Sequence, residues 1–181
     1  MRIILLGKMA AGKDTVANIL CEYHVFYRYS FATKLKEIAE SLFPDEFKSG
    51  KPRKLLQDIG SKMREIHPDC WADYLLRHAN RMYDLWTERQ VITDCRYRNE
   101  LEIAEKNGFI PVRVMCHPEI RLKRLQDRDG FVDPETFDHA SETELDSIHV
   151  EHKIDNNGNR EDLRSNVFEL IEKLLKEKQC M

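Results

Sequence analysis

The sequence predicts an α/β fold built on a doubly wound, parallel sheet of five strands. Short apolar runs alternate about five times with longer segments whose apolar residues recur at helical spacing. A glycine-rich turn joins the first apolar run to the first helix, and no internal repeat or low-complexity linker interrupts the alternation. Strands that are joined through helices run parallel, and the helices cover both faces of their sheet.

Each expected strand is a short apolar or aromatic run that ends at polar or turn-forming residues. The first run is almost entirely aliphatic, whereas the second alternates aromatic with polar side chains. The expected strands are residues 2–6, 25–31, 90–94, 109–115 and 152–155.

Each expected helix carries apolar residues three or four positions apart. Pro44 stops the second helix, and Pro118 opens the sixth. The third and fourth lack a glycine-rich turn and together predict an inserted helical layer, at about residues 45–88, that covers the substrate side. The first helix reaches residue 23, and the others are residues 32–43, 53–66, 69–86, 98–107, 119–128 and 160–178.

The glycine-rich turn at residues 7–15, Gly-Lys-Met-Ala-Ala-Gly-Lys-Asp-Thr, is the strongest functional feature. Glycines at both ends allow backbone N–H groups to turn inward, and the following helix adds the partial positive charge of its N-terminus. Lys13 adds a full charge that can reach the β- and γ-oxygens of a nucleoside triphosphate. The pattern Gly-x4-Gly-Lys between a strand and a helix therefore predicts a polyphosphate site. Its expected binding residues are Gly7, Ala10, Ala11, Gly12, Lys13, Asp14 and Thr15.

Asp14 occupies the position at which a serine or threonine usually places a hydroxyl on Mg²⁺, and Thr15 follows one place late. A triphosphate repels a carboxylate unless a cation lies between them. Asp14 therefore either faces the metal, directly or through water, or turns away to cap its own helix. The sequence leaves both alternatives open.

Composition excludes several classes of function. The chain has 181 residues, of which 41% are hydrophobic and 34% charged, so it is long enough for one well-buried domain and short for two. Its net charge of -3 argues against a polymeric nucleic-acid partner and favours a small charged ligand. Scattered cysteines without a C-x-x-C pair are typical of a reduced, cytoplasmic protein. The apolar N-terminal run is too short for a signal segment or a membrane span.

Two charged residues follow the expected strand at residues 90–94. The carboxyl ends of parallel strands line the ligand crevice of an open sheet, where Asp94 and Arg96 would emerge. Asp94 can hold Mg²⁺, usually through water, and Arg96 can bind a phosphate in a bidentate way. The structural alternative is that Asp94 caps the helix at residues 98–107.

Three arginines lie on one face of the sixth expected helix. Arg121, Arg124 and Arg128 are three and four positions apart, and like charges repel one another unless anions lie between them. The anions are either the acid-rich residues 133–151 or the phosphates of a closing active site, and both can apply in turn. The polar, weakly periodic segment 130–150 is expected to be the most mobile part of the chain.

Three further features have both a structural and a functional interpretation. The basic loop 48–54 is either a solvated turn or a contact for an anionic substrate. Trp71 is more consistent with a core position than with a stacking role, because isolated aromatic residues on helices usually pack inward. The turn 156–159 is either an ordinary loop or a backbone contact for a base edge.

These motifs resemble those of the P-loop nucleoside and deoxynucleoside monophosphate kinases, most closely the phage-type deoxynucleoside monophosphate kinases. The more specific elements are Gly-Lys-Asp-Thr at residues 12–15 and Asp-x-Arg-x-x-Asn-Glu at residues 94–100. The weaker elements are Ser30-Phe31-Ala32 with Leu35-Lys36, Leu56-Gln57-Asp58-Ile59-Gly60, Trp71, Ser141-Glu142 and Asn156-Asn157-Gly158. Together they span nearly the whole chain.

The resemblance implies a P-loop NTPase fold over residues 1–181 as a single kinase domain, with an arginine-bearing lid at about residues 119–150. It implies ATP- and Mg²⁺-dependent transfer of a γ-phosphoryl group to a (deoxy)nucleoside monophosphate, which yields the diphosphate and ADP. The acceptor oxygen is already anionic, so catalysis would come from positioning and electrostatics rather than from a strong base. Small-molecule nucleotides are the expected partners, and a homodimer is compatible with the sequence.

The resemblance also assigns roles to single residues. Lys13 and the loop backbone would hold ATP, and Arg96 would hold the acceptor phosphate. Asn157 and Gly158 would lie near adenine. The implied catalytic residues are Lys13, Asp94, Arg96, Arg124 and Arg128, with Arg121 as a further ATP contact and Asp14 and Asp94 as metal ligands.

Two other functions stay open. A P-loop kinase of another phosphorylated small molecule, of the dephospho-coenzyme A or phosphomevalonate type, shares a similar loop and lid, and the inserted helices would decide between the acceptors. A nucleotide-binding module without turnover is disfavoured. The chain has no guanine-type Asn-Lys-x-Asp signature, and an arginine-bearing lid is hard to explain without phosphoryl transfer.

Overall fold

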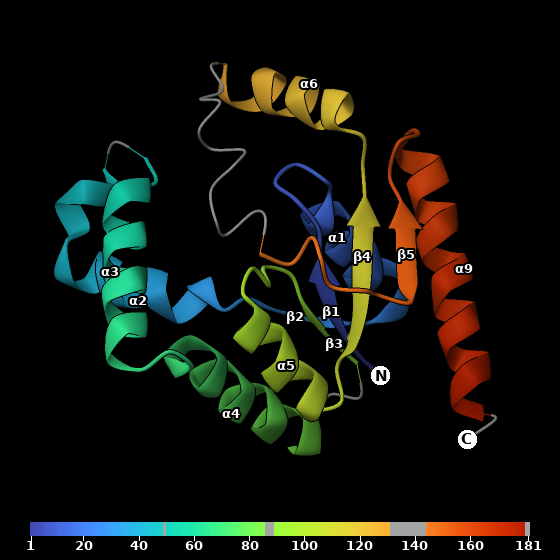
Figure 1. The fold of residues 1–181 in the computed structure, drawn as a ribbon, viewed down its shortest axis with the longest axis horizontal. Helices are drawn as coiled ribbons and strands as arrows, with labels where there is room; N and C mark the ends of the chain where they lie inside the picture. Colours follow the sequence, from blue (N-terminus) through green and yellow to red (C-terminus); the bar gives the residue numbers. More distant parts are fainter. Residues whose placement is uncertain (49, 86–88, 131–143, 180–181) are drawn as a thin grey trace.

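The computed structural model describes residues 1–48, 50–85, 89–130 and 144–179 (Figure 1). Strands and helices alternate in it as the sequence predicts. The strands are β1 (Arg2–Leu6), β2 (Tyr27–Tyr29), β3 (Gln90–Ile92), β4 (Ile110–Met115) and β5 (His152–Asp155). The helices are α1 (Lys13–His24), α2 (Ala32–Leu42), the 3-10 helix η1 (Pro44–Phe47), α3 (Arg53–Ile66), α4 (Cys70–Leu85), α5 (Arg98–Lys106), α6 (Pro118–Asp129) and α9 (Arg160–Gln179).

The five strands form one parallel sheet in the order β2-β3-β1-β4-β5. Strand β1 is central, and its Ile3 lies opposite Val91 of β3 and Ile110 of β4. The loop after β1 therefore lies beside the carboxyl ends of two neighbouring strands, where ligands bind in open α/β sheets. This arrangement confirms the predicted five-stranded parallel sheet.

Two apolar cores cover the two faces of the sheet. Successive side chains of β1 alternate between them, with Ile3 and Leu5 in the core that includes α1 and α9, and Ile4 and Leu6 in the core that includes α4 and α5. All four side chains are fully buried. The aliphatic run at the start of the chain is thus explained by burial on both faces.

Two local features differ from the sequence-based expectation. Strand β2 is shorter than residues 25–31, because Val25 ends α1 in a left-handed conformation (φ 57°) and Phe31 is already the N-cap residue of α2. As an edge strand, β2 pairs only with the three residues of β3, which limits its length. The second difference is η1, which begins at Pro44 and was not expected.

Helices α2 and α3 stand beside the sheet, on the side opposite α9, and α4 follows them in the chain before β3 (Figure 1). Trp71 of α4 is 5% exposed, and its Nε1 donates a hydrogen bond to the carbonyl oxygen of Gly60 in α3 at 3.3 Å. The structure thus confirms the core position of Trp71. None of the helices in the described part of the chain combines the length and apolarity of a membrane span.

The segment expected to be mobile falls mainly on residues 131–143, which lie outside the described residues, as do Ser141 and Glu142. The adjoining residues 144–150 form hydrogen bonds and an ion pair with residues that follow the strands of the sheet. Glu144 accepts a hydrogen bond from the backbone N–H of Arg98 at 2.7 Å, and Asp146 pairs with Lys8 at 2.7 Å.

Candidate active site

The loop after β1 contains two glycines at positions where a side chain would collide with another part of the site. Gly7 has φ +140°, and a Cβ atom there would lie 2.6 Å from the carbonyl oxygen of Val114 in β4. Gly12 has φ +99°, and its Cβ would lie 2.1 Å from Nδ2 of Asn156. The loop can therefore pack against β4 and the end of β5 only with glycine at both positions.

Lys13 begins helix α1 at the floor of this loop. Its ammonium group donates hydrogen bonds to the carbonyl oxygens of Gly7 and Lys8, the latter at 3.1 Å. Both of these carbonyl partners are neutral, and the contacts hold the charge of Lys13 inside the loop. The partial positive charge of the α1 N-terminus lies at the same place.

A cavity of about 530 Å³ opens on the loop and is lined by α1, α6, the turn after β5 and the start of α9. It brings together many of the residues that the sequence singles out. The predicted residues that line it are Ala10, Gly12, Lys13, Asp14, Thr15, Arg124, Arg128 and Gly158. Asn156 and Asn159, from the turn that the sequence offers as a possible base contact, also line it. The lining residues that sequence reasoning missed are Asn18, Arg160 and Leu163.

Asn156 links three parts of the site. Its side chain is buried, and Nδ2 donates a hydrogen bond to the carbonyl oxygen of Ala11 at 2.7 Å. Its own carbonyl oxygen accepts a hydrogen bond from Nη2 of Arg124 at 3.1 Å. The sequence signal for Asn156 is its position directly after the last strand, at the carboxyl edge where ligand-binding residues gather.

The three arginines of α6 approach the site in different ways. Arg121 is 6% exposed, and its Nη1 donates to the carbonyl oxygen of Met9 at the tip of the loop, at 3.5 Å. Arg124 contacts Asn156 and lines the cavity, whereas Arg128 lines it with an exposed side chain. Most of the acid-rich segment proposed as their partner lies outside the described residues, so its role stays a prediction.

The substitution Gly12→Ala should disrupt the loop. A Cβ atom would collide with the amide of Asn156, and the backbone conformation is one that side chains rarely adopt. We expect a loss of about 2 kcal/mol in the free energy of unfolding and loss of nucleotide binding. Urea unfolding and calorimetric titration with ADP measure the two effects. Gly108→Ala is the matched control, since Gly108 also has positive φ (+78°) but meets nothing within 4 Å. Equal nucleotide affinities of the two variants would contradict the role of Gly12.

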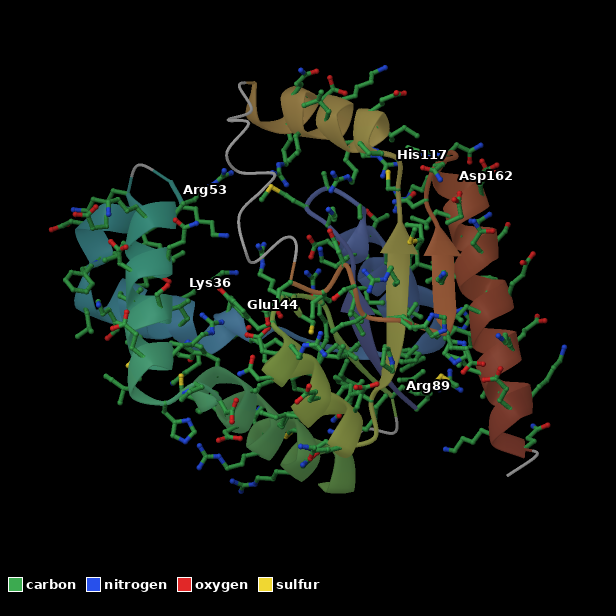
Figure 2. The ribbon with its side chains drawn as sticks, viewed as in Figure 1. Lys36, Arg53, Arg89, His117, Glu144 and Asp162 are labelled. Atoms are coloured by element: carbon green, nitrogen blue, oxygen red, sulfur yellow. The ribbon has the colours of Figure 1, made fainter. Side chains whose placement is uncertain are left out.

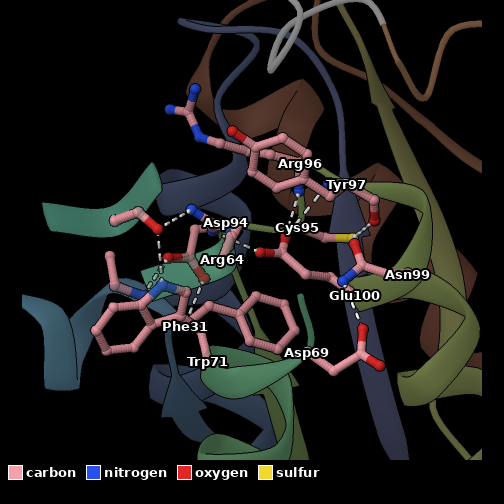
Figure 3. Close-up of polar contacts among 12 residues, drawn as sticks. Phe31, Arg64, Asp69, Trp71, Asp94, Cys95, Arg96, Tyr97, Asn99 and Glu100 are labelled. Atoms are coloured by element: carbon pink, nitrogen blue, oxygen red, sulfur yellow. Dashed lines mark hydrogen bonds and ion pairs between the residues drawn. The ribbon is translucent and has the colours of Figure 1, made fainter. Parts of the chain in front are cut away.

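Asp94 does not cap helix α5, so the structural alternative considered for it is wrong. Its carboxylate instead accepts hydrogen bonds from Oγ of Ser30 at 2.6 Å and from the backbone N–H groups of Phe31 and Ala32 at 2.8 and 3.0 Å (Figure 3). Asp94 thus fixes the N-terminus of α2 and is not among the cavity-lining residues. Its role as a ligand of Mg²⁺ stays a prediction.

Glu100 is the third residue of α5, and its side chain reaches back to the start of the helix as part of a capping box around the N-cap residue Tyr97. Its Oε2 accepts hydrogen bonds from the backbone N–H groups of Arg96 and Tyr97 at 3.0 and 3.3 Å, and its Oε1 pairs with Nη2 of Arg64 at 2.9 Å (Figure 3). Glu100 is 2% exposed, and this burial raises the pKa of its carboxyl, although the backbone of Arg96 and the side chain of Arg64 act in the opposite direction. The guanidinium of Arg64 also lies 4.4 Å from the ring centre of Tyr97. Glu100 therefore connects α3 to the loop that carries Arg96.

The turn after β5 only partly follows the prediction for a base contact. Gly158 lines the cavity. Asn157 is turned toward α6, where its Oδ1 accepts a hydrogen bond from the backbone N–H of His117 at 2.7 Å and its Nδ2 donates to Asp155 at 2.5 Å. The contact of Asn157 with adenine stays a prediction.

A second basic group lies between the helical layer and α6. The pKa of Lys51 is lowered mainly because its ammonium group is partly buried and loses hydration. The positive charges of four other residues lower it further, and these are Lys36, Arg53, Arg96 and Arg128. We call these five residues the basic cluster. Figure 2 shows Lys36 and Arg53 on the side of the helical layer that faces the sheet. An anion bound beside Lys51 would offset the repulsion that the other four cations exert on its ammonium group.

The sheet, the glycine-rich loop and the lysine at its helix form the arrangement of a P-loop protein. The chain belongs to the family described as AAA domain, whose model matches residues 3–138. No curated protein matches the chain.

Solved structures of kinases share the fold. A sugar kinase from Janibacter sp. HTCC2649 is 12% identical, with 94% of each chain covered and a TM-score of 0.61. A shikimate kinase from Acinetobacter baumannii is 17% identical, with 98% of this chain and 94% of that chain covered and a TM-score of 0.59. A dephospho-CoA kinase from Campylobacter jejuni is 16% identical, with 95% and 96% covered and a TM-score of 0.56. At these identities the similarity is one of fold.

Proposed function

We propose that the protein transfers the γ-phosphoryl group of ATP to a (deoxy)nucleoside monophosphate. The observation that carries this proposal is the basic cluster, a group of cations separate from the glycine-rich loop. An acceptor that already bears a phosphate needs positive charge of its own, in addition to the charge that holds ATP. A neutral acceptor would have no use for such a cluster.

The proposed binding site for ATP, the phosphoryl donor, consists of the glycine-rich loop and the residues around the cavity. The loop amides and Lys13 would bind the β- and γ-phosphates of ATP, and Arg124 and Arg128 would approach them from α6. Because Arg128 belongs both to the cavity lining and to the basic cluster, it lies where the donor and acceptor phosphates would meet. Its position supports a role in balancing the charge that moves between them.

Mg²⁺ normally accompanies ATP in this chemistry and neutralises charge on the phosphates. The side chains at the cavity fit such an ion, because Asp14 and Thr15 supply the hard oxygen atoms that it prefers. Asp14 is therefore the carboxylate that we propose to hold it, directly or through water, with the oxygen that does not pair with Arg28. Asp94 would act from farther away, since its oxygens already accept three hydrogen bonds.

The second candidate is a kinase of another phosphorylated small molecule, such as dephospho-coenzyme A or phosphomevalonate. The basic cluster is compatible with this class, and the similar fold of a dephospho-CoA kinase gives it support.

A thermal-shift panel separates the two candidates. It compares nucleoside monophosphates with the rival acceptors in the presence of ADP, and acceptor-dependent release of ADP from ATP is measured alongside. If no nucleoside monophosphate stabilises the protein, the proposed substrate class is wrong, and if ADP release needs no acceptor, the protein is not a kinase of this kind.

The substitution Arg53→Ala should weaken acceptor binding selectively. Removal of one cation from the cluster should raise KM for the acceptor about tenfold, with little change in KM for ATP. Steady-state kinetics with each substrate varied in turn measures this split. Lys54→Ala is the matched control, because the adjacent Lys54 is 89% exposed and pairs with Asp58 at 3.1 Å. An equal rise in KM for ATP and for the acceptor would contradict an acceptor site at the cluster.

A further inference from the structure

The unusual acid of the glycine-rich loop has a partner on the edge strand of the sheet. Asp14 forms an ion pair with Nη2 of Arg28 in β2. The same guanidinium group donates to Oδ1 of Asn18, one turn further along α1, at 3.3 Å. It also donates to Oγ1 of Thr93, directly after β3, at 3.4 Å. Arg28 therefore reaches from the sheet edge to the first turn of α1.

This contact lies at the rim of the candidate polyphosphate site. Asp14 and Asn18 both line the cavity, next to Lys13. The side chain of Asp14 is 77% exposed and that of Arg28 is 38% exposed, so the pair can be approached from the cavity. A carboxylate at this place would repel an incoming polyphosphate unless its charge is balanced.

We propose that Arg28 is the positioning residue that balances Asp14 and so allows this loop to bind a nucleoside polyphosphate. The guanidinium fixes the carboxylate on the side of β2 and removes most of its repulsion toward the phosphates. The identity of the ligand rests on the proposed function. The role of Arg28 rests on the ion pair and on its place at the cavity.

A purely structural role for the pair predicts a different result. Asp14 lies in the first turn of α1, where a negative charge interacts favourably with the helix dipole, and an exposed ion pair adds little to stability. If the pair served only the helix, the loss of Arg28 would change the thermal midpoint slightly and leave nucleotide affinity unchanged. Nucleotide affinity is therefore the measurement that separates the two roles.

The test is calorimetric titration of the full chain with ADP in the presence of EDTA, so that no divalent cation can replace Arg28. We expect Arg28→Ala to bind ADP about tenfold more weakly than the wild type, and the double variant Asp14→Ser with Arg28→Ala to recover most of the loss. The affinity of Arg28→Lys for ADP should lie between those of the wild type and Arg28→Ala. The loss of affinity in Arg28→Ala should become smaller at high ionic strength, because salt screens an exposed charge. Arg77→Ala is the matched control, since the exposed Arg77 contacts the backbone of its own helix.

A second variant keeps the inference testable if Arg28→Ala does not fold. Asp14→Asn removes the repulsive charge and leaves Arg28 in place, so it should bind ADP without metal at least as tightly as the wild type. Weaker binding by Asp14→Asn, or wild-type affinity in Arg28→Ala, would overturn the role of Arg28. A wild-type protein that binds ADP only with Mg²⁺ would overturn this inference alone, whereas one that binds no ADP with or without Mg²⁺ would overturn the proposed function as well.

Discussion

Replacement of Lys13 by alanine should abolish phosphoryl transfer while the fold stays intact. The ammonium group of Lys13 is held by two loop carbonyl oxygens at the N-terminus of α1, so it supplies a fixed charge where the phosphates would bind. Fixed charges of this kind usually contribute most of the rate enhancement in phosphoryl transfer, and we expect kcat to fall about thousandfold or more. Acceptor-dependent release of ADP measures the effect.

The fold should tolerate this change because Lys13 itself lines the cavity and its hydrogen bonds to Gly7 and Lys8 go to neutral carbonyl groups. We expect the free energy of unfolding to change by about 1 kcal/mol or less. Lys173→Ala is the matched control, since Lys173 is a half-exposed lysine of α9 that pairs with Glu177 at 3.6 Å. Turnover by Lys13→Ala near that of the control would end the assignment of the loop as the phosphate site.

Replacement of Glu100 by alanine should produce the largest loss of stability among the changes considered. The substitution leaves the guanidinium of Arg64 without its carboxylate and the backbone N–H groups of Arg96 and Tyr97 without an acceptor. Breaking a buried pair from one side is strongly unfavourable, and we expect a loss of about 3 kcal/mol in the free energy of unfolding. Urea unfolding measures it. Acceptor KM should rise as well, because the loop that carries Arg96 loses its support.

Glu100→Gln separates the charge of Glu100 from its hydrogen bonds. The glutamine oxygen can still accept from the backbone N–H groups of Arg96 and Tyr97, so Glu100→Gln should lower the free energy of unfolding less than Glu100→Ala does. Because burial raises the pKa of Glu100, the folded protein holds this proton more tightly than the unfolded chain. The contribution of Glu100 to the free energy of unfolding therefore decreases as pH rises from the unfolded pKa to the folded one, and Glu100→Gln should remove this slope. A wild-type slope in Glu100→Gln, or wild-type stability in Glu100→Ala, would contradict this account.

The fold could be predicted to a large extent because its signals are local. Period-two and helical spacing, together with Pro44, Pro118 and the glycine-rich turn, place the described α-helices and strands within a few residues of their observed limits. The limits of β2 were not predictable, because an edge strand ends where its partner strand ends. The five-stranded order follows from packing between elements that are distant in the chain.

The candidate site also has a part that the sequence predicts and a part that only the structure shows. By itself, the sequence determined the fold class and the phosphate-binding loop, because Gly7, Gly12 and Lys13 act through backbone conformation and a helix terminus within nine consecutive residues. Only the tertiary structure decided the partners of Asp14, Asp94 and Glu100 and the place of Asn156. Ion pairs and hydrogen bonds depend on distances in space, and Ala11 and Asn156, 145 positions apart, meet only when β5 lies beside β4. No spacing rule along the chain contains that information.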